Sequence, residues 1–460
     1  MIRPFYWLTF VIAIGFCLEV QASNSNAPNV LLLIADDMAC RDCGPYGNAE
    51  IRTPHLDRLA REGMTFDRAF TATAMCAPTR QQLYTGLFPV RNGAYPNHSK
   101  VKPGTHSIVH HLRDLGYRVG LIGKKHFGPK ESFPFELLNA KTGPAFLTRD
   151  KSQPFCLVVA SKSPHVPWTE GPNDYDPDRL TLPSWLVDTA EMRTAFSAYA
   201  SEITAFDQEV GNWLDLLDEH QLAKNTLVVA TSEQGPQMPG GKWTCYEYGL
   251  QVAFLARWPT TIAAGTRSSA MVQYVDFVPT IVEAAGGDPL QIDTGQAGSD
   301  SGGRDCDGRS FLKVLKGEAD DHHAWVYGIH TTQGIKAGTP FPIRSIRGTR
   351  YKYIQNLLSD SRFHNTVIEH DAANYWKSWV REAASNPHAM KLVQRYLKRP
   401  AEEFYDLEDD PYELTNLATV PAHQTRIQEM KKRLREWMQQ QNDMGVETEN
   451  AAQVHRTQRR

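Results

Sequence analysis

Short, uninterrupted apolar runs recur along this chain, and a turn-forming or charged residue bounds each of them. The clearest run, Asn29–Ala35, lies between Pro28 and Asp36. Continuous apolar runs of this length are typical of strands buried on both faces of a parallel sheet, because half-exposed strands alternate apolar and polar residues. The other candidate strands are Arg118–Gly123, Phe155–Ala160 and residues 225–230.

Helical patterns separate these runs. In residues 53–63, Thr53 is positioned to cap a helix, Pro54 to open it and Gly63 to close it. Residues 190–219 carry helical periodicity over a longer stretch. Strands that alternate with helices predict an α/β sandwich around a mostly parallel sheet.

The C-terminal third has a different pattern. Residues 343–354 read as two short strands around a turn at Gly348, and a helix is expected at residues 425–441. We expect the polar end from Gly445 to be disordered. The predicted organisation is a catalytic domain at residues 23–335, a C-terminal α+β subdomain with a small antiparallel sheet at residues 336–445, and a polar tail at residues 446–460.

The first 22 residues have the pattern of a secretory signal peptide, with Arg3 ahead of an apolar stretch at residues 5–18 and a small-residue cleavage pattern ending at Ala22. The stretch is short for a membrane span, although a retained anchor is the alternative. No second hydrophobic run follows, so we expect an exported protein, periplasmic or secreted, with no stable membrane anchor. The net charge of −3 gives no reason to expect a nucleic-acid partner.

The six cysteines beyond the signal are too few for a disulfide scaffold in a chain of this length. Cys40 and Cys43 have C-x-x-C spacing, but no second such pair completes a zinc site. They read either as a local disulfide or as two loop thiols.

Acidic and amide side chains follow two of the predicted strands. Asp36 and Asp37 follow the first run, and Glu233 and Gln234 follow the run at residues 225–230. Ligands of parallel sheets bind beyond the carboxyl ends of the strands, so these four side chains should converge on one edge. Carboxylate and amide oxygens suit a hard divalent cation such as Ca²⁺.

Four further segments carry reactive side chains. Cys76 opens the sequence C-A-P-T-R, which ends at Arg80; alone, such a cysteine could be a nucleophile or a small buried residue. A strand end followed by G-K-K-H-F-G presents Lys124 and His126, and S-P-H-V-P presents His165 on a proline-fixed loop as a general acid requires. Lys242 lies in G-K-W-T-C-Y-E.

These segments, in this order, resemble the motifs of the type I sulfatases: C-x-P-[S/T]-R, G-K-x-H-x-G and G-K-x-T-x-Y-E. The D-x-x-P-T block of that family is matched at residues 276–280, and its C-terminal Y-D-L-x-x-D-P signature at residues 405–411. The resemblance spans roughly residues 29–420. The G-K-K-H-x-G-P form is closest to that of the heparan N-sulfatases. An alkaline phosphatase-like fold is implied.

The resemblance also implies a site and a mechanism. Cys76 would be converted to formylglycine (3-oxoalanine) by a formylglycine-generating enzyme, and its hydrate would attack sulfur in line. The residues implied as Ca²⁺ ligands are Asp36, Asp37, residue 76, Glu233 and Gln234. The residues implied for catalysis are Arg80, Lys124 and Lys242 on the sulfate oxygens, His165 with Lys242 as the acid for the leaving group, and His126 as the base that expels sulfate. The chain departs from the family at Glu233-Gln234, where Asp-Asn is usual and each side chain is one methylene shorter.

The implied substrate is a sulfated oligosaccharide or polysaccharide. Tyr95, His98 and Trp168 could line its pocket or could equally be packing residues. Two alternatives stay open at this point: a phosphonate or phosphate ester hydrolase of the same superfamily, and a non-catalytic protein that binds sulfated glycans with Cys76 unmodified.

Overall fold

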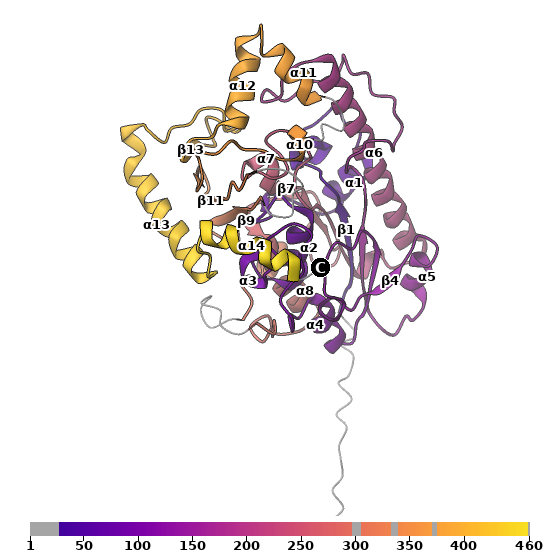
Figure 1. Ribbon diagram of the computed structural model, residues 1–460. Helices are drawn as coiled ribbons and strands as arrows, with labels where there is room; N and C mark the ends of the chain where they lie inside the picture. The colour runs from indigo at the N-terminus through magenta and orange to yellow at the C-terminus, as the bar shows by residue number, and fades with distance from the viewer. Residues whose placement is uncertain (1–26, 297–304, 333–338, 370–374, 459–460) are drawn as a thin grey trace, which may run out of the picture.

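The computed structural model describes residues 27–296, 305–332, 339–369 and 375–458, so the signal peptide predicted at residues 1–22 lies outside the described chain. Within these residues the chain forms two sheets and the helices around them (Figure 1). The strands of the larger sheet are β1 (Asn29–Ala35), β2 (Met64–Phe70), β3 (Arg118–Gly123), β4 (Glu136–Leu138), β5 (Phe155–Ala160), β6 (Thr226–Ser232), β7 (Gln251–Val252), β8 (Phe254–Arg257) and β9 (Thr266–Gln273).

The larger sheet is mixed but mostly parallel, with strand order β4-β3-β5-β1-β6-β8-β2-β7 and β9 paired to β2. β1 is its centre and pairs in parallel with both β5 and β6, so that Leu32 lies opposite Val158 on one side and Val229 on the other. β8 runs antiparallel to β6 and β2. The predicted buried strands and the parallel arrangement are confirmed.

Helices cover both faces of this sheet. Alternate residues of β1 point to opposite faces: Leu31 packs in the same core as Ile203 of α6, and Leu32 in the same core as Val278 of α8. The helices of this part of the chain are α1 (Pro54–Glu62), α2 (Cys76–Thr85), α3 (Pro89–Asn92), α4 (Ile108–Asp114), α5 (Gly143–Thr148), α6 (Ala190–Glu219), α7 (Glu247–Leu250), α8 (Phe277–Ala284) and α9 (Leu312–Leu315).

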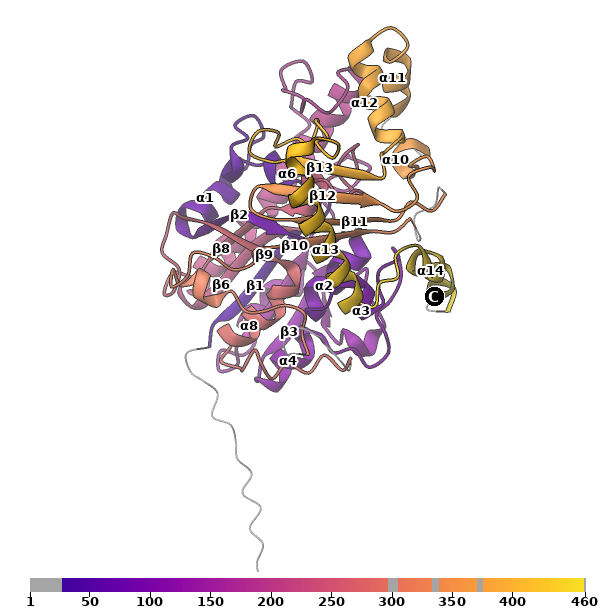
Figure 2. The same ribbon diagram turned by 90° about the vertical axis from the view of Figure 1, so that its left-hand side faces the viewer.

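The smaller sheet is antiparallel, and helix α13 (Gln424–Gln440) lies across it (Figure 2). Its strands, in spatial order, are β10 (Val326–His330), β11 (Ile343–Arg347), β12 (Tyr351–Asn356) and β13 (Glu402–Asp406). The hairpin predicted around Gly348 is confirmed as β11 and β12. Three helices, α10 (Thr366–Glu369), α11 (Tyr375–Glu382) and α12 (Pro387–Leu397), lie between β12 and β13 in the sequence. The boundary at residue 335 stays a prediction, and β10 lies on its N-terminal side.

The start of α1 differs from the prediction. Pro54 opens the helix and Gly63 follows its end as expected, but the Thr53 side chain caps nothing in α1 and accepts a hydrogen bond from Gly44 N at 2.8 Å. The carboxylate of Asp207 in α6 accepts from His55 N at 3.1 Å and from the next backbone N–H at 2.8 Å. The predicted threonine cap is therefore wrong, because a carboxylate 150 residues away replaces it.

The C-terminal end also differs from the prediction. Instead of a disordered tail from Gly445, the chain forms helix α14 (Val446–Gln458). Glu449 on this helix is fully buried and accepts hydrogen bonds from Thr332 N at 3.0 Å and from the Thr331 hydroxyl. The polar composition misled the prediction because the groups that satisfy Glu449 lie more than a hundred residues earlier.

Cys40 and Cys43 are buried thiols with no disulfide between them. The Cys43 thiol donates to Cys40 O at 3.4 Å. Of the two readings of the C-x-x-C pair, the structure therefore contains the loop thiols.

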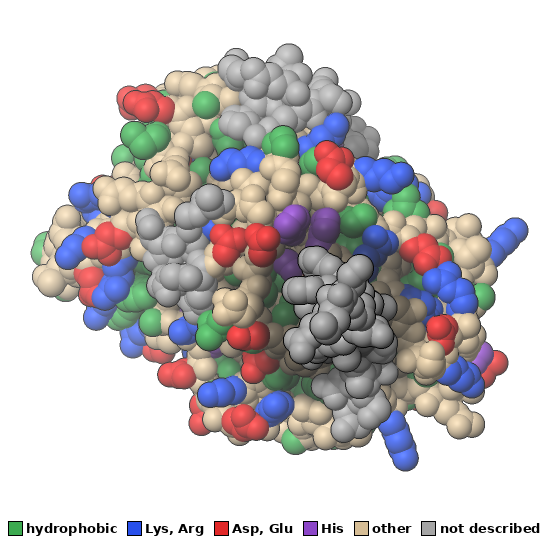
Figure 3. Space-filling model, turned by 90° about the horizontal axis from the view of Figure 1, so that it is seen from below, with side chains coloured by type: hydrophobic (Ala, Val, Ile, Leu, Met, Phe, Trp, Pro, Cys, Tyr) green, Lys and Arg blue, Asp and Glu red, His purple; other side chains and the backbone are tan. Residues whose placement is uncertain are grey.

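Acidic and basic side chains are interspersed on the face seen in Figure 3, in keeping with the small net charge. Among the described residues, none of the helices is both long and apolar enough to traverse a lipid bilayer.

Candidate active site

The predicted site residues come together at the carboxyl edge of the larger sheet. Asp36 and Asp37 follow β1, and Glu233 and Gln234 follow β6, its parallel neighbour. β3 and β5 lie on the other side of β1 and end at the same edge, ahead of the segments that carry Lys124, His126 and His165. This convergence follows from the strand order and was expected from the sequence.

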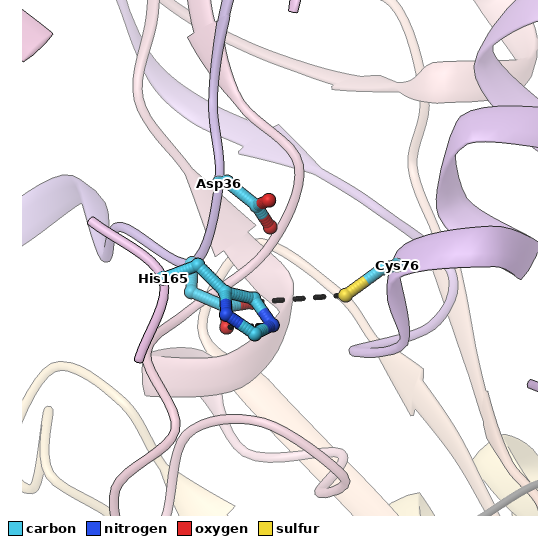
Figure 4. A group of neighbouring side chains, drawn as sticks. Asp36, Cys76 and His165 are labelled. Carbon is cyan, nitrogen blue, oxygen red and sulfur yellow. Dashed lines mark hydrogen bonds and ion pairs between the residues drawn. The ribbon is translucent and has the colours of Figure 1, made fainter. Parts of the chain in front are cut away.

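Cys76 is the first residue of α2 and is buried. Its Sγ lies 4.0 Å from Asp37 Oδ1 and 3.4 Å from Gln234 Nε2. Figure 4 shows the Cys76 side chain leaving the helix end toward Asp36 and His165, which approach from the opposite side. The sulfur atom therefore occupies the middle of the acidic group at the sheet edge.

Three cations pair with the three carboxylates of the cluster. Lys124 Nζ lies 2.5 Å from Asp36 Oδ2, and Lys242 Nζ lies 2.6 Å from Asp37 Oδ2. Arg80 Nε lies 2.5 Å from an oxygen of the third carboxylate, Glu233 Oε2. The Arg80 side chain is fully buried and Lys242 nearly so, whereas Lys124 is partly exposed.

The pairing affects the three acids differently. Although burial raises it, Arg80 and Lys124 lower the pKa of Glu233, whereas the pKa values of the two aspartates are raised. Burial and the neighbouring Glu233 raise the pKa of Asp36 well above its usual range. Burial also raises the pKa of Asp37, although Lys242 and His165 oppose this. Such upward shifts arise where buried carboxylates crowd together, and a bound cation would reverse them.

The Cys76 thiol behaves in the opposite way. Although burial raises its pKa, Lys124 and Lys242 together with the two neighbouring histidines hold the pKa of Cys76 well below its usual range. The position therefore favours an anion, or a group that develops negative charge.

His165 has one ring nitrogen committed to the backbone. Its Nδ1 lies 2.5 Å from Val166 O, so Nδ1 carries a proton and donates it there. Nε2 then faces the site, 3.7 Å from Asp37 Oδ2. Burial lowers the pKa of His165, but Asp37 and Cys76 together outweigh it and the net shift is upward. A protonated Nε2 directed into the site can act as a general acid.

His126 lies beside Cys76 and also contacts a second histidine. The His126 ring interacts with the Cys76 thiol. Its Nε2 lies 2.7 Å from His98 Nδ1, and its own Nδ1 is buried without a hydrogen-bond partner. Nε2 is therefore engaged by His98, whereas Nδ1 has no hydrogen-bond partner among the described residues.

Several site residues have left-handed backbone conformations. The φ angles of Asp37, His126 and Trp243 are 74°, 47° and 65°. Residues with a side chain rarely adopt such angles, which cost of order 1–3 kcal/mol each and cluster at functional sites. The fold therefore holds these three positions in place by the packing around them.

A cavity of about 650 Å³ opens above the cluster. His98 lines it, whereas Tyr95 is buried and donates to Thr448 O, and Trp168 packs against Tyr199. Of the three sugar-pocket candidates, only His98 is therefore in place. The lining residues that the sequence did not indicate come from segments with no motif; they are Asn97, Lys162, Thr169, Glu170, Glu202, Gln237 and Thr366.

The donor set fits a hard divalent cation. Ligand atoms of Asp36, Asp37, Cys76 and His165 lie within 4.8 Å of one another. Gln234 Oε1 is buried without a hydrogen-bond partner, while Gln234 Nε2 lies 2.6 Å from Asp37 Oδ1. Since the two ends of an amide are easily interchanged, a half-turn would direct the free oxygen toward the acidic group. Glu233 lies outside this group, and its Oε2 pairs with Arg80 Nε at 2.5 Å. The two aspartate carboxylates and the amide oxygen match the oxygen ligands that Ca²⁺ prefers.

Known proteins share sequence with this chain over most of its length. Residues 28–139 and 138–287 match the model of the Sulfatase family. The chain is 33% identical to an ulvan-active sulfatase of Formosa agariphila over 93% of this chain and 83% of the relative. It is 29% identical to the N-sulphoglucosamine sulphohydrolase of Homo sapiens, over 91% of each chain.

Solved structures share the fold. A protein solved with its substrate D-glucosamine-2-N,6-O-disulfate aligns with a TM-score of 0.70 at 21% identity, over 91% of this chain and 99% of the other. A 2-O GAG sulfatase aligns with a TM-score of 0.67 at 18% identity, over 91% and 93%. The architecture is the alkaline phosphatase-like fold that the motifs implied. The chain belongs to the sulfatase family and is a sulfuric ester hydrolase.

Proposed function

We propose that this sulfatase removes sulfate from a sulfated oligosaccharide or polysaccharide, with residue 76 as the nucleophile. The observation that carries the proposal is the position of Cys76, at the start of α2, between the acidic group and an open cavity lined by two lysines and two histidines of the expected motifs. The names of the relatives, one active on ulvan and one on N-sulphoglucosamine, point to saccharide substrates.

The nucleophile in this proposal is a modified residue. When Cys76 is oxidised to formylglycine, its hydrated aldehyde supplies a nucleophilic oxygen at this position, and a bound Ca²⁺ supplies the positive charge that favours the ionised oxygen. The residues that would hold the cation are Asp36, Asp37, Glu233 and Gln234, together with residue 76. A formylglycine-generating enzyme is the partner that this maturation requires.

Cationic side chains receive the sulfate group. Lys124 and Lys242 line the cavity, and Arg80 lies beneath them against Glu233. These cations are already held by carboxylates, so they need no reorganisation when a sulfate oxygen arrives. Arg80 Nη1 is buried without a hydrogen-bond partner, and Nη2 lies 3.9 Å from Asp36 Oδ2.

Two histidines handle protons on opposite sides of the reaction. His165 Nε2 is directed into the cavity and is placed to protonate the leaving oxygen or nitrogen of the saccharide, with Lys242 beside it. His126 lines the same cavity as residue 76, and its Nδ1, which is buried without a hydrogen-bond partner, would accept a proton from residue 76 when sulfate departs. The two roles require different protonation states, which fits the different surroundings of the two rings.

Export is part of the proposal. The predicted signal peptide at residues 1–22 would deliver the protein to the periplasm or the medium, where polymeric sulfated glycans are encountered. N-terminal sequencing of the mature protein, expressed in a host that exports it, tests this step: the sequence should begin after residue 22.

Sulfate release tests the activity itself. The purified, formylglycine-containing protein should release sulfate from at least one member of a panel of ulvan, heparan and chondroitin oligosaccharides, measured by ion chromatography. It should act poorly on aryl phosphate diesters. Faster hydrolysis of the diesters would favour the phosphate ester hydrolase. Tight glycan binding without sulfate release would favour the non-catalytic binding protein.

A further inference from the structure

We propose that His98 is a positioning residue for His126: it holds the His126 ring so that Nδ1, and not Nε2, faces residue 76. The inference rests on the proposed function. It concerns a residue that none of the recognised motifs contains.

The contact between the two rings is direct. His126 Nε2 and His98 Nδ1 lie 2.7 Å apart, and the ring centroids lie 4.7 Å apart at an interplanar angle of 39°. At this distance a proton is shared between the two nitrogens, which removes Nε2 from any other role. The ring can then present only Nδ1 to the buried side of the cavity.

The backbone at both histidines is constrained in the same way. The φ angles of His98 and His126 are 62° and 47°, in the left-handed region. Two such residues that face each other across a hydrogen bond are unlike ordinary surface histidines, because each conformation has an energetic cost that surrounding contacts must offset.

Gln81 supplies those contacts. It is fully buried in α2 and follows Arg80 directly. Its Nε2 donates to Ser99 O at 3.0 Å, and its Oε1 accepts from Val101 N at 3.1 Å and from Gly128 N at 3.3 Å. One side chain therefore ties together the segment after His98 and the segment after His126. Both are anchored to the helix that begins with Cys76.

Asn97 links the pair to the same helix. Its Nδ2 lies 3.4 Å from His98 Nε2, and its Oδ1 lies 3.5 Å from Ala77 N. A series of hydrogen bonds therefore runs from α2 through Asn97 and His98 to His126. Because His98 is the member that contacts the His126 ring, we infer that the orientation of this ring depends on His98. His98 itself is exposed at the cavity wall.

Substitutions of His98 that keep or remove a polar atom at the position of its Nδ1 test the inference. The amide of asparagine can place a polar atom near the position of His98 Nδ1, whereas the longer glutamine amide resembles Nε2. We expect His98→Ala and His98→Gln to lower kcat for a sulfated saccharide about 10²-fold, the loss that follows from a misplaced catalytic group, with KM within threefold of wild type. His98→Asn should recover most of that loss. His388→Ala, an exposed histidine of α12 outside the cavity, is the matched control.

Two results would overturn the inference: an asparagine variant as impaired as the alanine variant, or a change confined to KM, which would make His98 a substrate contact. A readout independent of turnover separates this failure from failure of the proposed function. Long-range ¹H–¹⁵N spectra of the histidine rings, assigned with His126→Gln, should show one fixed tautomer of His126 in wild type and in His98→Asn. In His98→Ala the two nitrogens should average. An averaged wild-type ring contradicts the inference even if the enzyme hydrolyses sulfate esters as proposed.

Discussion

Two buried clusters of charged side chains in this molecule have different roles. At the junction with the smaller sheet, Glu247 of α7 lies 2.9 Å from Lys352 Nζ and 3.2 Å from Arg347 Nε, and Lys352 also lies 3.1 Å from Glu413. Two acids meet two bases there. Although burial raises it, Lys352 and Arg347 bring the pKa of Glu247 down to about 2.

The cluster at the sheet edge also pairs acids with bases, but the pKa values of its aspartates differ from that of Glu247. Asp36 and Asp37 keep raised pKa values although each has a lysine within hydrogen-bond distance. Gln234 Oε1 and Arg80 Nη1 are buried without hydrogen-bond partners. At the junction the acids and bases pair with one another, although burial raises the pKa of Glu413, whereas the site cluster borders the cavity and keeps the unpartnered Gln234 Oε1. The difference separates a structural ion-pair network from a functional one.

The largest effect should come from the centre of the site cluster. Cys76→Ala should reduce sulfate release to background, because no other described side chain can supply the nucleophile, and leave the unfolding midpoint close to that of wild type. Cys306→Ala, which removes another buried thiol, is the control and should retain activity. Sulfate release is the measurement; measurable turnover by Cys76→Ala would remove residue 76 from the mechanism.

Calcium should matter to one cluster only. Chelation should abolish most activity and lower the unfolding temperature. Saturating Ca²⁺ at about a hundred times its Kd should restore both and stabilise the protein by about 2.7 kcal/mol. Asp36→Asn should lose this response to Ca²⁺. Its unfolding temperature should nevertheless be close to that of chelated wild type, because a carboxylate with a raised pKa contributes little stability when no cation is bound.

Glu247→Gln should keep the full calcium response, which calorimetry with and without chelator can compare. Calcium stabilisation that survives Asp36→Asn, or disappears in Glu247→Gln, would contradict the distinction between the two clusters.

The role of His165 predicts a dependence on the leaving group. His165→Ala should lower kcat for saccharide sulfates by about 10²- to 10⁴-fold, the usual contribution of general acid catalysis. The loss on an activated aryl sulfate should be much smaller, because its leaving group needs no proton. Steady-state kinetics on the two substrates measure the ratio. An equal loss on both would argue that His165 binds sulfate and does not donate a proton.

The junction cluster should act on stability. Glu247→Gln leaves Lys352 and Arg347 short of a partner and should cost about 3–5 kcal/mol of unfolding free energy, measured by denaturant titration. Activity at 25 °C should stay within a few-fold of wild type. A variant as stable as wild type would show that the network adds no net stability.

The same cluster predicts a pH dependence. The native pKa of Glu247 is about 2, below its usual value near 4.5. Its stabilisation is therefore complete above pH 4.5 and is lost as the pH falls toward 2. Wild type should lose stability more steeply over this interval than Glu247→Gln, and parallel curves would contradict the assignment.

Much of this architecture could be predicted from local patterns. The runs that become β1, β3 and β5 are continuous and apolar because those strands are buried on both faces, and Gly348 marks its hairpin. The convergence of Asp36, Asp37, Glu233 and Gln234 followed from parallel strand ends. Those inferences needed only short-range sequence.

The failures share one physical cause, which is a partner remote in sequence. Asp207 replaces the Thr53 cap, and Thr331 and Thr332 order the α14 tail through Glu449. His98 lies in no motif, and its hydrogen bond to His126 depends on how two loops meet above Gln81. Such pairings depend on the folded surface, and neither composition nor periodicity reports them.

The most direct test of the account is the mass of the tryptic peptide at residues 69–80, from protein produced in a host with a formylglycine-generating enzyme. The account predicts an aldehyde in place of the Cys76 thiol, together with sulfate release by the same preparation. A wholly unmodified cysteine, while a control sulfatase from the same cells is converted, would contradict the proposed nucleophile and favour a protein that binds sulfated glycans without cleaving them.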